Sequence, residues 1–331
     1  MKNKLKILLV YRHKSIGFSI ERVFSTLSEE LGKHLVVEEF VVPRKGSMPW
    51  DVIINNFFTF NNRNNATIYH ITGHVHDVLL SLIGLKSLLT IHDLVFLDNV
   101  RNPFIKAYKW LFWFYLPIKI SNRVVCISNQ TRNNILKRLK TRKLVVIHNP
   151  IDPMFYFSEK EFNSDKPIIL HIGTGWNKNL SRTIQALENI PCHLRIIGHL
   201  GETQLRELED SSLDFSNSVG LTNLEIQNEY LKCDIVNFPS IYEGFGMPII
   251  EAHKTGRVVL TSNIEPLIEV SNNAAEMVDP YSVFSLKNGY QKIINDKNYR
   301  DNLIYKGQLN AERFSVQKIA KDYLDVYNLI R

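Results

Sequence analysis

Residues 239–252 read PSIYEGFGMPIIEA and follow the short apolar run Ile235–Phe238. The run has the length of a buried strand, and Pro248 suits the start of a helix because its missing N–H costs nothing in the first turn. Gly244 and Gly246 lie between the two, and glycine permits the sharp backbone turns that connect a strand to a helix. The stretch therefore predicts a strand, a tight turn and a helix, which is one unit of an α/β fold.

Two glutamates flank this turn. Glu243 precedes it and Glu251 is expected in the first turn of the helix, so both carboxylates are expected at one mouth. The start of a helix attracts phosphate groups through its unpaired N–H groups, and an ionised carboxylate accepts two hydrogen bonds from a sugar diol. The pattern favours a phosphate and sugar site; a helix capped by glycine and proline, with glutamates that are only solvated, is the alternative.

Apolar runs of strand length recur along the whole chain and alternate with helical patterns, which is typical of parallel sheets covered by helices. The runs are Lys6–Tyr11, Leu35–Val42, Thr67–Ile71, Leu88–Ile91, Val124–Ile127, Leu144–Ile147, Pro167–Ile172, Leu194–Ile197, Ser218–Gly220, Ile235–Phe238 and Val258–Thr261. A polar, irregular stretch between Asn149 and Lys166 interrupts the pattern. The sequence thus predicts two doubly wound α/β domains in series, residues 1–160 and 161–315.

The composition agrees with two globular domains. The chain has 331 residues, 44% of them hydrophobic and 22% charged, which excludes a low-complexity or fibrous chain. Its longest apolar stretch, Trp110–Pro117, is far shorter than the roughly 20 residues that span a bilayer. Cys126, Cys192 and Cys233 show no pairing pattern, and no signal-peptide pattern precedes Arg12, so a cytoplasmic location is expected.

The formal net charge of +7 is divided unequally along the chain. Residues 1–160 hold 23 Lys and Arg against 11 Asp and Glu, a net charge of +12, whereas residues 161–331 carry −5. A basic half fits nucleic acid, an anionic membrane surface or a phosphorylated substrate. Residues 101–123 mix aromatic residues with Lys and Arg, which suits either a core helix or a helix lying at a membrane interface.

The stretch EGFGMPIIEA, residues 243–252, resembles the signature of retaining nucleotide-sugar glycosyltransferases of the family-4 type, in which seven residues separate two glutamates. Five further segments resemble motifs of that family: Thr90–Leu94, Val125–Ser128, His148–Asp152, Ile172–Asn179 and Ala311–Ser315. Pro150 replaces a glycine of the family's pattern. The resemblance implies the GT-B fold, two Rossmann-like domains facing a central cleft, with a C-terminal helix, residues 316–331, that packs back toward the first domain.

The same resemblance implies roles for residues of the second domain. Glu251 is expected to bind the ribose hydroxyls of the donor nucleotide, and Glu243 to contact the transferred sugar or the adjoining phosphate. Backbone N–H groups of Phe245, Gly246 and Met247 are expected to line the same pocket.

A glycine-containing loop that begins at Gly173 carries the expected phosphate contacts. By resemblance, Lys178 neutralises the diphosphate as the glycosidic bond breaks. Many family members carry an arginine where this chain has Thr174, so one expected cation is missing. Either Lys178 and backbone N–H groups suffice, or Arg12 or Lys14 of the first domain supplies the second charge.

In the first domain the resemblance points to Gly17, expected against the donor phosphates, and to His92, expected to hydrogen-bond a hydroxyl of the donor sugar at the end of a buried strand. A glycine needed for turn geometry and a buried structural histidine are the alternatives. His70, His74 and His76 lack Asp, Glu or Cys partners at metal-ligand spacing, and no Asp-x-Asp pair is present. No metal ion or other cofactor is therefore expected.

The resemblance thus implies a metal-independent retaining enzyme that moves a hexose-type sugar from a nucleotide-sugar donor to a glycan or lipid-linked acceptor, in bacterial surface polysaccharide synthesis. Its expected place is the cytoplasm at the inner face of the membrane, with peripheral contact to anionic lipid. A GT-B-fold epimerase or phosphorylase and, because of Thr174, an inactive sugar-nucleotide-binding relative are the alternatives. A nucleic-acid-binding protein would leave Glu243 and Glu251 unexplained, so nucleic acid is not an expected partner.

Overall fold

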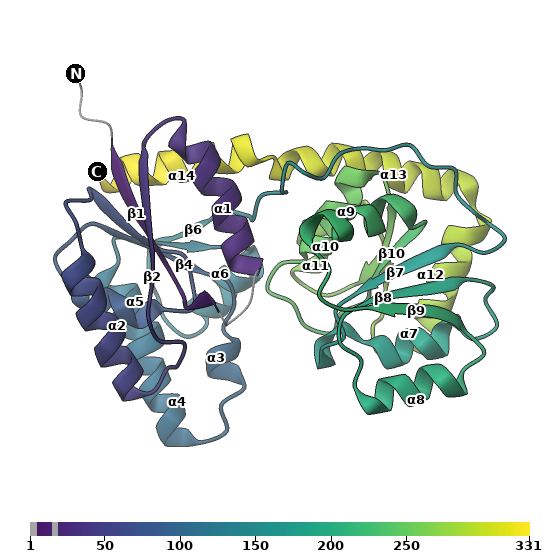
Figure 1. Cartoon of the computed structure of the whole chain (residues 1–331), viewed down its shortest axis with the longest axis horizontal. Helices are drawn as coiled ribbons and strands as arrows, with labels where there is room; N and C mark the ends of the chain where they lie inside the picture. The colour runs from purple at the N-terminus through teal and green to yellow at the C-terminus, as the bar shows by residue number, and fades with distance from the viewer. Residues whose placement is uncertain (1–4, 15–18) are drawn as a thin grey trace. The chain divides into compact units, whose positions relative to one another are not determined.

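The computed structural model describes residues 5–14 and 19–331, which form two compact units (Figure 1). Unit 1 combines the chain up to Pro150 with Val316–Arg331, and unit 2 is Ile151–Ser315. This boundary lies earlier than residue 160, where the sequence places it. The polar stretch after Pro150 is fastened to unit 2, because the Ser158 N–H donates to the Thr255 carbonyl and Arg257 Nη1 donates to the Ser158 carbonyl.

Unit 1 is built on a parallel six-stranded sheet in the order β2-β1-β3-β4-β5-β6. The strands are β1 (Lys6–Tyr11), β2 (Val36–Val41), β3 (Ile68–Ile71), β4 (Ser87–Ile91), β5 (Arg123–Cys126) and β6 (Leu144–Val146). The helices are α1 (Ser19–Gly32), α2 (Pro49–Asn62), α3 (Val95–Asp98), α4 (Pro103–Lys109), α5 (Leu116–Ile120), α6 (Asn129–Leu136) and α14 (Val316–Ile330), with the 3-10 helix η2 (His76–Leu82) and the π-helix η3 (Trp110–Tyr115). The strand order reverses direction between β1 and β3.

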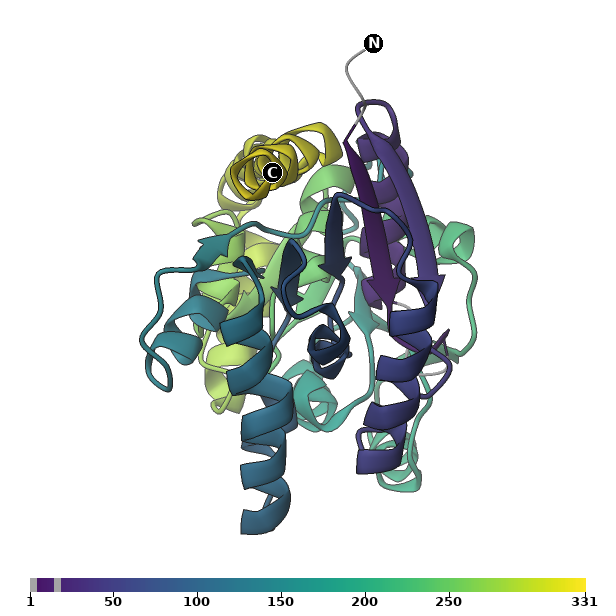
Figure 2. The same ribbon diagram turned by 90° about the vertical axis from the view of Figure 1, so that its left-hand side faces the viewer.

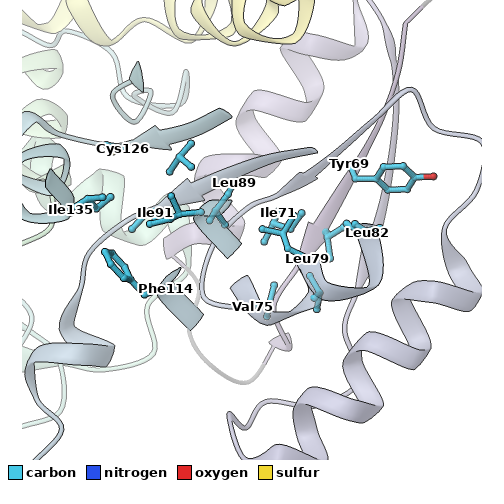
Figure 3. Close-up of a cluster of buried hydrophobic side chains, with 14 of the residues drawn as sticks. Tyr69, Ile71, Val75, Leu79, Leu82, Leu89, Ile91, Phe114, Cys126 and Ile135 are labelled. Atoms are coloured by element: carbon cyan, nitrogen blue, oxygen red, sulfur yellow. The ribbon is translucent and has the colours of Figure 1, made fainter. Parts of the chain in front are cut away.

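Helices cover both faces of this sheet, which explains why β3 and β4 are buried along their whole length. On one face, Ile71 and Ile91 belong to a buried hydrophobic cluster that includes Leu79 of η2 and Phe114 of η3 (Figure 3). Side chains alternate between the faces of a strand, so His70 points to the opposite face. There its Nδ1 lies 2.7 Å from the Tyr327 hydroxyl of α14, which also packs against α1. The C-terminal helix is thus a structural part of unit 1.

Unit 2 is a second parallel sheet in the order β12-β11-β10-β7-β8-β9, which reverses direction between β7 and β10. The strands are β7 (Ile168–Ile172), β8 (His193–Ile197), β9 (Asp214–Ser218), β10 (Ile235–Phe238), β11 (Val258–Ser262) and β12 (Glu276–Val278). The helices are α7 (Leu180–Leu187), α8 (Glu202–Asp210), α9 (Asn223–Lys232), α10 (Met247–Thr255), α11 (Leu267–Ser271), α12 (Val283–Asn295) and α13 (Lys297–Ala311), with 3-10 turns η4 (Trp176–Lys178) and η5 (Glu312–Phe314).

The predicted pair of doubly wound α/β units is confirmed, with two differences in unit 2. The strand expected at Ser218–Gly220 is β9, which lies earlier, and β12 was not predicted. Both are edge strands: β9 reads DFSNS and β12 has only three residues, so neither carries a long apolar run. Among the described helices, none combines the length and the apolar character that crossing a membrane requires.

Candidate active site

Most of the candidate residues follow strands that border the reversals in strand order. In unit 2, Lys178 follows β7 and Glu243 follows β10, and these two strands are paired neighbours. In unit 1, His74 follows β3 and His92 follows β4, which are also paired. Ligands of doubly wound sheets bind beyond the carboxyl ends of the strands at such reversals. Lys178, Glu243 and His74 therefore lie where the topology of each unit favours ligand binding, and His92 lies one strand further from the reversal of unit 1.

Lys178 and Glu243 form an ion pair in unit 2. Lys178 Nζ lies 2.6 Å from Glu243 Oε1, and Asn177 Nδ2 donates to the same oxygen at 3.1 Å. The Asn177 amide also donates to the Tyr242 carbonyl at 2.9 Å, which holds the loops after β7 and β10 together. The side chains of Lys178 and Glu243 are 22% and 14% exposed, so the paired charges are accessible yet positioned.

The backbone around Lys178 is shaped by two residues with positive φ. At Gly173 (φ +90°) an added Cβ would lie 3.0 Å from Lys178 Cε, so the glycine makes room for the lysine side chain. Asn179 (φ +65°) is the N-cap residue directly before α7, and its side-chain amide donates to the carbonyls of Pro239 and Pro280 at 3.0 and 2.7 Å. The loop that carries Lys178 is thereby tied to the loop that carries Glu243.

Thr174 stands where the family pattern has arginine, and its side chain holds two loops together. Its hydroxyl donates to the His199 carbonyl at 2.5 Å, after β8. An added Cβ at Gly198 (φ +145°) would lie 3.0 Å from Thr174 Cγ2, so the two loops are in close contact. These contacts explain the presence of a threonine at position 174 without any bound ligand. A role of Thr174 in donor binding stays a prediction.

The turn before α10 has the predicted strand–turn–helix form. Gly246 adopts φ +123°, and an added Cβ would lie 2.9 Å from Leu267 Cδ2, so this position requires glycine. The Phe245 ring is buried and packs edge-on against Phe314 with 5.8 Å between centroids. The Phe245 side chain therefore belongs to the core of unit 2, and the expected contact of its backbone N–H with the donor stays a prediction. Met247 is the first residue of α10 and is half-buried.

Glu251 is the fifth residue of α10, so it lies in the second helical turn. The sequence analysis expected it in the first turn, and that expectation is wrong. Its side chain is buried, and the Tyr230 hydroxyl of α9 donates to Oε2 at 2.6 Å. Tyr230 is itself completely buried. A charge-assisted hydrogen bond of this length holds the Glu251 carboxylate in a defined position.

Beneath the ion pair lies a buried polar network that the sequence analysis did not identify. Asn237 of β10 donates from Nδ2 to His171 Nδ1 of β7 at 2.9 Å, and its Oδ1 accepts from the Tyr290 hydroxyl at 2.7 Å. Burial, assisted by the nearby charge of Lys178, lowers the pKa of His171 to about 3. The neutral imidazole and the amide thus lock the two strands that lead to Lys178 and Glu243. The available signal was Asn237, a polar residue inside an apolar strand.

Trp176 is a second residue of this region that was not predicted. It begins η4, two residues before Lys178, and its side chain is 67% exposed. The indole stacks on Tyr242, the neighbour of Glu243, with 6.4 Å between centroids and 27° between planes. An exposed indole supported from behind offers a flat apolar surface beside the ion pair.

In unit 1, His92 is buried at the end of β4. Its Nε2 donates to the Thr72 carbonyl at 2.8 Å, and an added Cβ at Gly73 (φ +132°) would lie 2.5 Å from His92 Cδ2. Burial, and next the neighbouring His74, lower the pKa of His92 to about 3. The ring is therefore neutral, and with the proton on Nε2 its Nδ1 is a hydrogen-bond acceptor. His74 stacks on it at 6.1 Å, with Nε2 3.9 Å from Asp93 Oδ2.

The remaining predicted residues of unit 1 have other surroundings. His70 and His76 are buried and hydrogen-bonded, His76 through Nδ1 to the Trp113 carbonyl at 2.8 Å. Arg12 binds both carboxylate oxygens of Glu21 at 2.8 and 3.0 Å, so it is already neutralised inside unit 1. Gly17 lies outside the described residues. Within residues 5–14 and 19–331, no three His, Cys, Asp or Glu side chains form a group that could hold a metal ion.

Comparison with protein families gives two matches that together span most of the chain. Residues 154–310 match the model described as Glycosyl transferases group 1, and residues 22–155 match the model described as Glycosyltransferase Family 4. Unit 2, with Lys178, Glu243 and Glu251, lies almost entirely in the first match.

Individual relatives are distant. The chain is 24% identical to an uncharacterized glycosyltransferase of Methanocaldococcus jannaschii, covering 77% of this chain and 72% of that protein. It is 27% identical to an O-antigen chain mannosyltransferase of Salmonella typhimurium (58% and 56% covered). It is 23% identical to a Campylobacter jejuni enzyme named N,N'-diacetylbacillosaminyl-diphospho-undecaprenol alpha-1,3-N-acetylgalactosaminyltransferase (66% and 63% covered).

Solved structures resemble the chain over nearly its full length. Sucrose-phosphate synthase from Thermosynechococcus elongatus matches with a TM-score of 0.79 at 17% identity, covering 99% of both chains. Anabaena HepE, solved in complex with UDP and glucose, matches with a TM-score of 0.75 at 15% identity, covering 98% of this chain and 99% of that one. These similarities establish the fold, and the GT-B architecture predicted from the sequence is confirmed.

Proposed function

We propose that the chain moves a hexose-type sugar from a nucleoside diphosphate to a lipid-linked glycan with retention of anomeric configuration. The proposal starts from the family: the chain belongs to the glycosyl transferases group 1 family and is a glycosyltransferase. The observation that carries the proposal is the Lys178–Glu243 ion pair at the reversal in strand order of unit 2. A cation that is positioned and only partly exposed suits the diphosphate of a nucleotide sugar.

The donor occupies unit 2 in this proposal. The ribose diol binds the carboxylate of Glu251, which the Tyr230 hydroxyl holds in place. The diphosphate lies at the start of α10, since the N-terminal end of a helix attracts anions through its backbone N–H groups and its dipole. There the diphosphate replaces Glu243 as the ion-pair partner of Lys178 Nζ. The released Glu243 carboxylate then accepts hydrogen bonds from the transferred sugar.

The reaction proceeds on one face of the sugar. The bond from the anomeric carbon to the diphosphate oxygen breaks, and its electron pair goes to that oxygen, where Lys178 stabilises the growing negative charge. The acceptor hydroxyl forms the new bond from the same face, and its proton passes to the leaving diphosphate. His92 is the unit 1 residue proposed to position a donor-sugar hydroxyl, since its neutral ring accepts at Nδ1. We expect this chemistry to need no metal ion.

The names of two relatives support the proposed acceptor. One is an O-antigen chain mannosyltransferase, and another carries a diphospho-undecaprenol in its name. Both fit bacterial surface polysaccharide synthesis, and a lipid-linked acceptor would place the enzyme at the inner face of the cytoplasmic membrane. The HepE complex with UDP and glucose supports a nucleotide-sugar donor.

The first experiment identifies the donor by thermal stabilisation with UDP, GDP, ADP and their sugars. A ligand at 100 times its dissociation constant should add about 2.7 kcal/mol to the free energy of unfolding. Glu251→Gln should abolish the stabilisation, whereas Glu312→Gln, on an exposed ion pair with Lys254, should leave it intact. Stabilisation by none of these compounds would contradict the proposed donor site.

A second experiment separates transfer from the alternatives. Release of nucleoside diphosphate that depends on added acceptor glycan indicates transfer, whereas an epimerase or phosphorylase would convert the donor without it. Glu243→Ala should lower the rate of acceptor-dependent release by about 100-fold or more, as loss of a positioned charged group at a reacting centre does. A wild-type rate in this variant would remove the assigned site.

A further inference from the structure

Helix α2 has the reverse of the usual surface pattern. Its buried residues are Val52, Asn55 and Thr59, two of which are polar. Its outer side carries large apolar side chains at the spacing of one helical stripe: Trp50, Ile53, Ile54, Phe57 and Phe60. Trp50 is 75% exposed and Phe57 68% exposed. A globular unit rarely turns such a stripe toward water without a partner for it.

Hydrogen bonds fix this orientation of α2. The Asn55 side chain accepts from the Arg44 N–H at 3.0 Å and donates to the Arg44 carbonyl at 3.2 Å. The neighbouring Asn56 accepts from the Ser81 N–H of η2 at 2.9 Å. Rotating the helix to bury Trp50 and Phe57 would break these bonds and leave buried polar groups without partners, so the outward stripe belongs to the folded state.

Helix α4 adds a second apolar element to the same part of unit 1. None of its residues is buried, and Phe104 is 84% exposed. Ile105 beside it, and Trp110 and Leu111 in the following π-helix, are also exposed. The 3-10 helix η2 packs against both α2 and η3, so it connects these two elements. The exposed apolar residues of α2, α4 and η3 that are named above are together called the apolar face of unit 1.

This face lies at a defined edge of the sheet. Helix α2 follows β2 and α4 follows β4 by way of α3, so both helices begin near the carboxyl ends of the strands (Figure 2). Trp50 and Phe104, at the starts of the two helices, therefore lie toward the edge that also carries His92.

The charges beside the apolar face are predominantly positive. No Asp or Glu occurs between Asp98 and Asp152, a span that contains 11 Lys and Arg. Arg101 and Lys106 are exposed at α4, and Arg44 and Lys45 precede α2, whose own acidic residue is Asp51. Apolar and aromatic side chains flanked by cations match the boundary between the acyl chains and the headgroups of an anionic membrane.

We propose that the apolar face of unit 1 docks on the surface of an anionic lipid membrane, with Trp50, Phe57 and Phe104 entering the headgroup region. The proposal extends the membrane contact expected for residues 101–123 to α2, which the sequence analysis did not implicate. It does not depend on the proposed transfer reaction, since it rests on surface residues of unit 1. In a transferase with a lipid-linked acceptor, this docking would hold the His92 edge of the sheet near the lipid surface.

The test is flotation of the full chain with vesicles of phosphatidylcholine alone and with vesicles that also contain phosphatidylglycerol. Wild type should float with the anionic vesicles, and added salt should weaken binding because part of the attraction is electrostatic. The double variant Trp50→Ser/Phe57→Ser should lower the partition coefficient by about tenfold or more. The matched control is Phe284→Ser, a 73% exposed phenylalanine of α12 in unit 2, which should bind as wild type.

Two further measurements make the outcome decisive. Melting temperatures within about 2 °C of wild type should show that the variants are folded, since exposed substitutions change stability little. Light scattering reports self-association. Wild type that floats with neither vesicle type, a double variant that floats like wild type, or a wild-type dimer that the double variant dissociates would overturn membrane docking. Transfer to a water-soluble acceptor, measured alongside, shows separately whether the catalytic proposal holds.

Discussion

The Lys178–Glu243 ion pair leads to a prediction about nucleotide affinity in which two substitutions act in opposite directions. In the ligand-free protein the lysine charge is already neutralised at 2.6 Å by Glu243. A bound diphosphate must compete with that carboxylate for the lysine and lies near its negative charge. Glu243→Gln should therefore strengthen the binding of a nucleoside diphosphate, and Lys178→Met should weaken it.

The magnitude follows from the partial exposure of the pair. Full Coulomb attraction at this distance is several kcal/mol at an effective dielectric constant of about 20, but desolvation and solvent screening remove most of it. Because the two side chains are 22% and 14% exposed, a net change of about 1–2 kcal/mol is expected for each substitution. That corresponds to a change of roughly 5- to 30-fold in dissociation constant.

The assay is titration calorimetry with the nucleoside diphosphate that gives thermal stabilisation, compared with its monophosphate. The opposing shifts should appear with the diphosphate and shrink with the monophosphate, because the effect belongs to the second phosphate. Lys254→Met, in the exposed Lys254–Glu312 pair of the same unit, is the matched control and should change neither affinity. Shifts of the same sign in both site variants, or equal shifts with the monophosphate, would refute the reasoning.

Three further predictions concern stability. Tyr230→Phe removes the 2.6 Å hydrogen bond to buried Glu251 and should lower the free energy of unfolding by about 1–3 kcal/mol in urea denaturation; an unchanged midpoint would count against that bond. Gly246→Ala forces φ +123° on alanine and brings Cβ to 2.9 Å from Leu267, so its melting temperature should fall by several degrees, equivalent to about 1–3 kcal/mol. Burial raises the pKa of Asp77 to about 7, so the folded state holds a proton that the unfolded state has released, and stability falls as pH rises from about 4 to 7. Asp77→Asn should therefore stabilise the protein by about 1–3 kcal/mol at pH 8 and much less at pH 4.5; an equal effect at both pH values in urea titrations would contradict this assignment.

The distribution of exposed aromatic residues shows where patterns in the sequence lead to incomplete conclusions. The run PWDVIINNFFTFNN of α2 contains enough apolar residues for an ordinary amphipathic helix, and its spacing alone gives no sign that the apolar stripe faces outward. That orientation depends on Asn55 and Asn56 finding partners in Arg44 and η2. The partners become neighbours only when β2 and β3 take their places in the sheet.

The sequence by itself determined most of the elements and the form of the turn before α10, while the roles of the site residues stay predictions. Apolar runs of strand length fixed most strands, because burial on both faces of a parallel sheet requires continuous apolar residues. Gly246 and Pro248 fixed the turn before α10, because few other residues tolerate those backbone conformations. The tertiary structure alone decided which side chains meet. Lys178 and Glu243 are 65 positions apart and become partners because β7 and β10 are neighbours across the reversal in strand order. The same holds for the Tyr230 hydroxyl that orders Glu251 and for the burial that keeps His92 neutral, since desolvation and hydrogen bonding depend on packing between distant segments and not on local composition.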